Sequence, residues 1–426
     1  MSTYNRIATP RAFVDLISYN LAHGWSALAN ITALQDNGST AVTFDSGSII
    51  EMFDMKPSNH VVIDADNQQF YIQYDTEFGT DSLAESSFLA ILNHNLHDAN
   101  AVINVDISDN AAFPAIVGST AIVFSTSNDR ITDGSTSGLF DDFSAGDKIL
   151  VAGAAQSGNN GEKTITGATA NYVSVSENLT DESAGATVTI QGFTRISTTG
   201  NHTKVINADA DGTAGGIDPA ANGWTLITFP TEILDNKYLR ITFADEDGSG
   251  EDFSADIKIG SILYGEIVDW AHSPDLGITT TVDYDGTILQ QSVGGSTYAN
   301  STHFGQPNWS TTVPWNLNAS ATSNYSFNRR DGRINHSMKF SYLTDTDVFA
   351  LNQHGATTSH WFDSDNLHAS FYQRILGQHL PFLFTIDGTS TSEGDYGLFR
   401  LANSGFSSTQ VAHQVWDVAL DITETW

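Results

Sequence analysis

Short stretches in which apolar and polar residues alternate recur along much of this chain. The clearest lie at residues 70–74, 101–107, 237–243 and 415–422. Alternation with a period of two residues places the apolar side chains on one face of a β-strand. Residues 88–92 are apolar throughout, which predicts a strand buried on both faces. The pattern therefore predicts an all-β fold.

Composition agrees with this fold class and limits the classes of partner. Only 16% of the residues are charged, 11% are aromatic and 35 are glycine, a mixture that suits strands joined by tight turns. The 17 basic and 50 acidic residues give a net charge of −33. A field of that sign repels nucleic-acid phosphates and anionic lipids. We therefore expect neither nucleic-acid binding nor membrane insertion.

The absence of cysteine excludes disulfides, thiolate nucleophiles and thiolate metal sites. The first residues are polar, and no apolar stretch typical of a signal peptide follows them. We therefore expect the protein to fold in the cytoplasm of the cell that makes it.

Strand and turn signals divide the chain into four expected segments. Residues 1–58 are expected to be an N-terminal assembly segment. Residues 59–113 and 193–275 are expected to form the two halves of one antiparallel sandwich. Residues 114–192 would be a small, barrel-like β domain inserted in a loop of that sandwich, because surface loops tolerate insertions. Residues 276–426 would form a C-terminal β domain.

One or two short helices are expected within this C-terminal segment. Thr344 is suitably placed to cap a helix over residues 345–353. Residues 366–376 are the second candidate. The remaining apolar runs of the segment predict strands, so the expected fold class stays all-β.

Three stretches of the sequence resemble structural proteins of tailed bacteriophages. Residues 88–96 (FLAILNHNL) and 257–265 (IKIGSILYG) are similar to the jelly-roll, galactose-binding-like sandwiches of phage minor tail proteins. Residues 143–149 (FSAGDKI) and 182–186 (ESAGA) resemble a small β domain that recurs in phage structural proteins. The C-terminal strands, with PFLF at 381–384 and VWDVAL shortly before the end, look like those of tail-completion or distal-tail proteins.

The resemblance implies a non-enzymatic structural component of the virion, near the tail tip or baseplate. Such a protein assembles into a symmetric ring, as a trimer or hexamer, and contacts other phage tail proteins. It needs no cofactor. The jelly-roll would point outward, either as a spacer or to contact a host glycan.

The densest acidic stretch lies at residues 245–256. Asp245, Asp247, Ser249 and Asp256 follow the spacing of oxygen ligands in an EF-hand loop. The last position carries Asp where Glu is usual, and the flanking segments are predicted strands. Two interpretations stay open, a structural Ca²⁺ site in a hairpin loop and a solvated acidic turn.

Aromatic and basic residues of the last segment are candidates for glycan or subunit contacts. Trp309, Trp315 and Trp361 could form a platform on which sugar rings stack, or they could pack in a core or interface. Arg329 and Arg330 belong to the one basic cluster of an acidic chain. They would serve either an inter-subunit salt bridge or a charged hairpin turn.

His94 is the remaining candidate for metal or sugar binding, and its alternative is a corner histidine that fixes a turn. No Gly-x-Ser-x-Gly, P-loop or dinucleotide-binding motif occurs. Two alternative functions stay open beside the virion protein. One is a carbohydrate-binding adhesin or receptor-binding protein. The other is a polysaccharide-degrading enzyme, which needs two carboxylates at a set separation.

Overall fold

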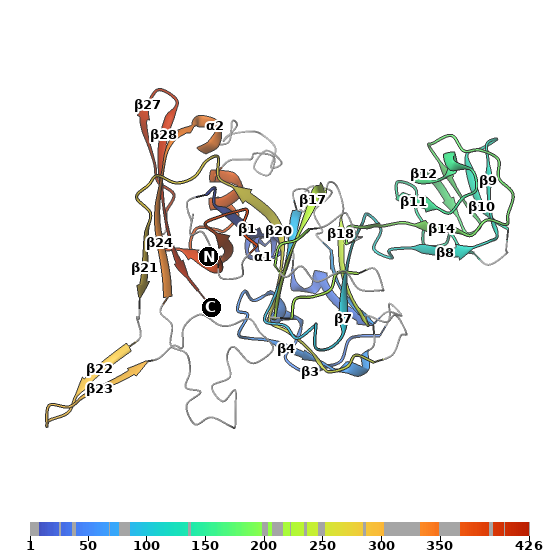
Figure 1. The fold of residues 1–426 in the computed structure, drawn as a ribbon. Helices are drawn as coiled ribbons and strands as arrows, with labels where there is room; N and C mark the ends of the chain where they lie inside the picture. The colour runs from blue at the N-terminus through green and yellow to red at the C-terminus, as the bar shows by residue number, and fades with distance from the viewer. Residues whose placement is uncertain are drawn as a thin grey trace.

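The computed structural model confirms the all-β class (Figure 1). It describes every residue except 1–7, 25–26, 36–39, 68, 76–85, 135–137, 198–202, 207–215, 222, 234–236, 246–251, 284–286, 302–332, 349–366, 392–394, 404 and 426. Most of the described strands lie in antiparallel sheets, and the described helices are few and short.

The largest sheet has eleven strands and joins the N-terminal part of the chain to the C-terminal part. In order along the sheet these are β16 (Thr203–Lys204), β17 (Trp224–Ile233), β6 (Ser86–Leu92), β20 (Ser261–Asp269), β1 (Arg11–Asp15), β25 (Phe382–Thr385), β26 (Tyr396–Leu401), β28 (Val415–Glu424), β24 (Arg333–Thr344) and β21 (Thr279–Asp283), with β27 (Ser408–Ala412) paired to β28.

Strand β1 lies in the middle of this sheet, between β20 and β25. Gly265 of β20 lies opposite Asp15, and a Cβ atom there would come within 2.0 Å of the Val14 carbonyl oxygen. The close approach of the two strands therefore requires glycine. Strands from residues 1–58, 59–275 and 276–426 share one sheet, and the division of the chain into those domains stays a prediction.

A second sheet of five strands faces β17, β6 and β20, and the two sheets enclose the largest core cluster. Its order is β15 (Thr194–Arg195), β7 (Ala101–Ser108), β18 (Tyr238–Asp245), β5 (Phe70–Asp75) and β2 (Ile31–Gln35). From β5 to β6 to β7, and from β17 to β18 to β20, the chain crosses from one sheet to the other. The predicted β-sandwich is confirmed.

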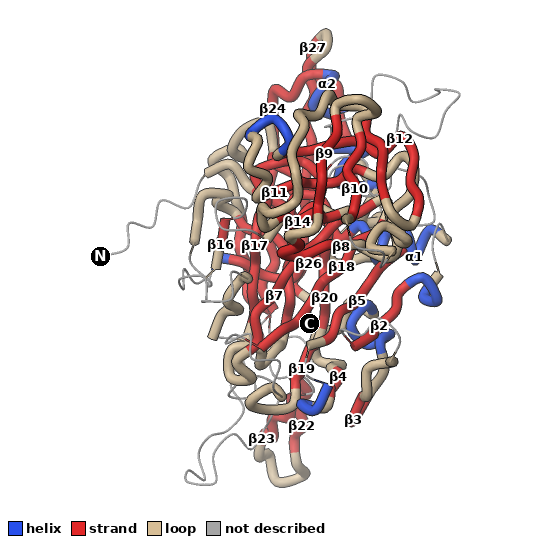
Figure 2. Tube along the Cα trace, turned by 90° about the vertical axis from the view of Figure 1, so that its right-hand side faces the viewer, coloured by secondary structure: helices blue, strands red, loops and turns tan. Residues whose placement is uncertain are grey.

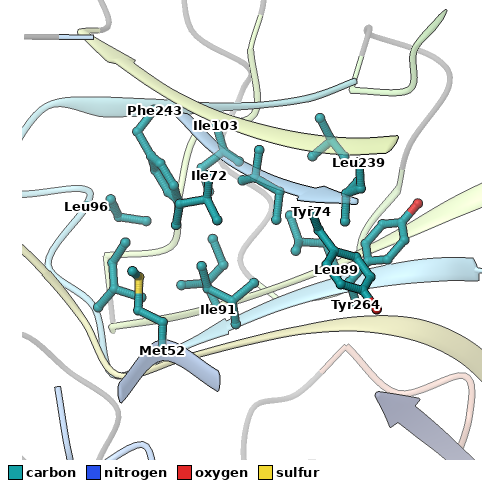
Figure 3. Close-up of a cluster of buried hydrophobic side chains, with 14 of the residues drawn as sticks. Met52, Ile72, Tyr74, Leu89, Ile91, Leu96, Ile103, Leu239, Phe243 and Tyr264 are labelled. Carbon is teal, nitrogen blue, oxygen red and sulfur yellow. The ribbon is translucent and has the colours of Figure 1, made fainter. Parts of the chain in front are cut away.

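Figure 3 shows the core between these sheets, where Ile72, Ile103 and Phe243 face Leu89 and Ile91. Residues 88–92 of β6 are fully buried, as their apolar run predicts. β7 departs from its alternating pattern, because all eight of its residues are buried. Its polar positions are satisfied inside the protein, since Arg195 forms a bidentate pair with Asp106 at 2.8 and 3.0 Å.

Residues 115–191 form a seven-stranded sheet of their own, with a separate core cluster. The order is β8 (Ala115–Ser119), β14 (Val188–Gln191), β11 (Lys148–Ala152), β12 (Gly161–Thr169), β13 (Tyr172–Val175), β10 (Arg130–Asp133) and β9 (Ile122–Ser125). The first and last strands of this sheet, β8 and β9, are consecutive in sequence but form no ladder with each other. The expected barrel is therefore not closed. Figure 1 shows this unit as a lobe beside the sandwich.

Two small sheets complete the strands that the structure describes. A three-stranded sheet contains β19 (Ile257–Ile259), β4 (Val61–Ile63) and β3 (Phe44–Ser46). A two-stranded hairpin contains β22 (Thr287–Gln291) and β23 (Thr297–Ser301). Both views place this hairpin and β27 at opposite ends of the molecule (Figures 1 and 2).

The helical elements are α1 (Leu16–His23), α2 (Asp345–Val348), the π-helix η6 (Leu367–Gln373) and the 3₁₀ turns η1 (Leu28–Asn30), η2 (Ile49–Phe53), η3 (Ala65–Asn67) and η4 (Ser157–Asn159). α2 begins where the sequence predicts a helix, and residues 349–353 of that prediction lie outside the described residues. The Thr344 side chain does not act as the expected cap acceptor. Its backbone N–H and its hydroxyl both donate to Asp347, at 2.7 Å.

Candidate functional site

The predicted calcium loop is only partly described, since Asp247 and Ser249 lie outside the described residues. Asp245 accepts a hydrogen bond from the Asn100 amide at 3.3 Å. Asp256 instead accepts from the backbone N–H of Ala65 at 3.2 Å. Within the described residues, no three His, Asp or Glu side chains come together in a way that could hold a metal ion. The calcium site stays a prediction.

The predicted glycan or interface residues all lie outside the described residues: Trp309, Trp315, Arg329, Arg330 and Trp361. The sugar platform and the inter-subunit salt bridge therefore stay predictions.

His94 lies buried at the corner that follows β6. Its Nδ1 accepts a hydrogen bond from the Leu96 N–H at 3.3 Å, so its Nε2 carries the proton and donates to the Thr225 hydroxyl at 2.9 Å. Burial, followed by the charges of His97 and Lys258, lowers the pKa of His94 to about 3. Both ring nitrogens are engaged within the protein, and this favours the corner interpretation over a metal ligand.

The neighbouring asparagines extend the same corner. The Asn93 amide donates to the Pro57 carbonyl oxygen at 2.6 Å. Asn95 accepts from the Lys258 N–H at 2.7 Å and donates to the Asp256 carbonyl oxygen at 2.8 Å. The Asn-His-Asn sequence thus ties the end of β6 to β19 and to the segment before β4.

A buried group of charges lies where β1, β20 and η6 meet. Glu266 of β20 and Arg374, which directly follows η6, form an ion pair whose side chains are 9% and 2% exposed. Beside it, Asp15 caps α1 by accepting from the Ser18 N–H at 3.0 Å and also accepts from the Tyr264 N–H at 2.9 Å. Burial raises the pKa of Asp15 to about 6, although these hydrogen bonds lower it. These charges join the sandwich to the C-terminal part of the large sheet.

The connection to the inserted unit is also clamped. The guanidinium of Arg240 on β18 lies 4.1 Å from the ring centroid of Tyr71 and 4.0 Å from that of Phe113. It donates to the Gln73 side-chain oxygen at 2.8 Å. Phe113 belongs to the segment that leads from β7 into the insert. On the return segment, the Gly192 carbonyl oxygen accepts from the Ser108 hydroxyl at 2.7 Å.

Exposed surfaces suited to assembly lie at β21 and at the β22–β23 hairpin. All five residues of β21 are exposed, and β21 pairs with β24 alone among the described strands. The hairpin exposes the apolar side chains Ile288, Leu289, Val293 and Tyr298.

The sequence holds a signal for this surface that is a matter of composition and belongs to no motif. No Asp, Glu, Lys or Arg occurs between Asp285 and Arg329, although the whole chain carries a net charge of −33. This uncharged stretch includes the hairpin. The exposure of its apolar residues could not have been inferred from sequence, because alternation also fits a half-buried strand.

No helix in the parts of the chain that the structure describes is long and apolar enough to cross a bilayer. The chain matches no protein-family model, no curated protein and no solved structure.

Proposed function

We propose that this protein is a non-enzymatic structural component of a tailed-bacteriophage virion, located at the tail tip or baseplate. It assembles there into a symmetric trimeric or hexameric ring and contacts other tail proteins. The observation that carries the proposal is the edge strand β21, which ends an eleven-stranded sheet with five exposed residues.

An exposed edge strand presents backbone N–H and C=O groups that a strand of another chain can pair with. Proteins that stay monomeric usually blunt such edges with Lys, Pro or a bulge. β21 contains neither Lys nor Pro, and its pairing with β24 has no register shift. Its one charged side chain, Asp283, accepts a hydrogen bond from Asn335 at 2.6 Å.

The sequence resemblances support the virion assignment, and one of the three lies on the sandwich. Residues 88–96 and 257–265, which resemble phage jelly-rolls, form β6, β19, the start of β20 and the corner at His94. In this proposal the sandwich and its clamped insert form a firm outward-pointing spacer that can contact a host glycan. The proposed assembly needs no cofactor, and Ca²⁺ bound at residues 245–256 would be structural.

The proposal is tested by the mass of the purified protein in solution, measured by light scattering over a range of concentrations with and without Ca²⁺. A closed trimer or hexamer, seen as rings in negative-stain images, is expected. A monomer at every concentration would contradict ring assembly, and a glycan-binding screen would then test the adhesin alternative.

A further inference from the structure

Two apolar surfaces are exposed at opposite ends of the molecule (Figures 1 and 2). We call the β22–β23 hairpin the arm. Its apolar side chains are largely exposed, at 68% for Leu289, 110% for Val293 and 62% for Tyr298. The second surface lies beside the β27–β28 hairpin, where Tyr342 is 81% exposed and Val411 is 51% exposed. We call it the Tyr342 end.

The arm has no described sheet neighbour, because β22 and β23 pair with each other alone among the described strands. An isolated two-stranded hairpin is at best marginally stable in water. The register places Leu289 opposite Ala299 on one face and Gln290 opposite Tyr298 on the other. Apolar side chains therefore occupy both faces, as expected for a hairpin that is covered in its working state.

A second copy of this chain is the covering partner that the two surfaces indicate, because every copy exposes one of them at each end, and charge opposes this contact least at the arm. Two copies of a protein with a net charge of −33 repel each other. That repulsion opposes contact least where one of the two surfaces is uncharged. The arm meets this condition, because it lies in the stretch between Asp285 and Arg329 that lacks acidic and basic residues.

The backbone conformation at the Tyr342 end explains why the Tyr342 side chain is exposed. Tyr342 has a φ of 65°, in the left-handed region that bulky residues rarely adopt. It lies at a register shift between Phe340 and Leu343 of β24. A bulge redirects a side chain out of the alternating pattern. Here the redirected ring is exposed, which is typical of a contact residue.

We propose that the arm of one copy packs against the Tyr342 end of the next copy, in a head-to-tail contact. The inference rests on the proposed self-assembly and assigns the contact between copies to these two surfaces, which leaves the β21 edge for a strand of another tail protein. Because the two surfaces lie at opposite ends and differ from each other, the contact is heterologous. Repeating it generates a ring when the rotation closes.

The test uses two variants of the full chain and one control, all analysed by light scattering. Leu289→Asp places a charge on the arm. Tyr342→Gly removes the aromatic side chain, and glycine accepts the φ of 65° without strain. Val117→Asp changes a 77% exposed apolar residue of the inserted unit and serves as the control. We expect the wild type and the control to form the same oligomer and each of the two variants to be monomeric.

Mixing the two variants supplies one intact arm and one intact Tyr342 end. The head-to-tail contact predicts a dimer of twice the 45.9 kDa chain mass and nothing larger. The chain has no cysteine. Val293→Cys on the intact arm of the Tyr342→Gly copy and Val411→Cys at the intact Tyr342 end of the Leu289→Asp copy would therefore form one disulfide that links the two chains of this dimer.

Each contrary outcome has a distinct meaning. If either variant alone keeps the wild-type mass, the altered surface is not in the contact, and ring assembly would use another surface. If both variants are monomeric but their mixture forms no dimer, the head-to-tail pairing is wrong. A monomeric wild type at every concentration overturns the proposed function together with this inference.

Discussion

Replacing Glu266 with Gln tests whether the buried ion pair with Arg374 holds the sandwich to the C-terminal part of the large sheet. The change keeps the shape of the side chain and removes its charge. Arginine is not deprotonated in proteins, so a guanidinium whose side chain is 2% exposed would lose its carboxylate partner.

The expected cost follows from the burial of both groups. Removing one member of a buried ion pair typically destabilises a protein by about 3–5 kcal/mol. Because each 1.4 kcal/mol corresponds to a factor of ten, local opening would become roughly 140- to 3,700-fold more frequent.

Amide hydrogen exchange measures this opening segment by segment. Peptides that cover β1 and β20 should exchange faster in Glu266→Gln, because these strands are paired beside the lost charge. Peptides of the inserted unit, which has its own core, should exchange as in the wild type and serve as the internal reference.

Two further variants serve as controls. Glu162→Gln breaks the surface pair with Lys148, whose side chains are 66% and 64% exposed, and should leave exchange unchanged. The double variant Glu266→Leu with Arg374→Met replaces both charges with apolar groups and should recover most of the protection. Unchanged protection of β1 and β20 in a folded Glu266→Gln protein would refute the reasoning.

Three other predictions concern the glycine crossing, the histidine corner and the insert. Gly265→Ala should abolish stable pairing of β1 with β20, because its Cβ would meet the Val14 carbonyl oxygen at 2.0 Å, and it should therefore melt below the wild type in a thermal scan. Gly167→Ala, whose Cβ would have nothing within 4 Å, should melt like the wild type. His94 has a folded pKa of about 3, below the unfolded value of 6.5, so it stabilises the fold above pH 6.5 and loses that contribution as the pH falls. The stability advantage of the wild type over His94→Gln in urea unfolding should therefore shrink by about 1.4 kcal/mol per pH unit between these values, and a constant advantage would contradict the assignment. Arg240→Ala removes the guanidinium between Tyr71 and Phe113 and should speed proteolysis near residues 109–114, while Arg130→Ala, which removes a similar contact with Tyr172 inside the insert, should not.

The local patterns of the sequence predicted the fold class and several elements. The apolar run at 88–92 is a fully buried strand, and the start of α2 lies at Asp345 as expected. Asn159-Asn160-Gly161 is a sequence signal for a hairpin turn, and β11 and β12 do pair as a hairpin on either side of it. The length of the loop was not predictable from this signal. Gly161 already begins β12, and the Asn160 amide closes a longer loop by bonding both backbone groups of Ala154.

The candidate sites were harder to predict than the fold, for a physical reason. Alternation says which side chains share a face, but it does not say what covers that face. Asp106 alternates as a solvent-facing residue would, and yet it is buried against Arg195. In the same way, the apolar residues of the arm fit a half-buried strand but are exposed. Both outcomes depend on partners that are distant in sequence.

The central position of β1 sets an order of events during synthesis. Arg11 pairs with Asp269 on one side and with Thr385 on the other. Strand pairing in the large sheet therefore cannot be completed until nearly the whole chain has left the ribosome. The inserted unit draws its strands from residues 115–191 and can fold well before that point. The nascent chain thus carries a folded inserted unit while its first strand, β1, remains unpaired. During this interval the unpaired strand makes the chain most prone to aggregation.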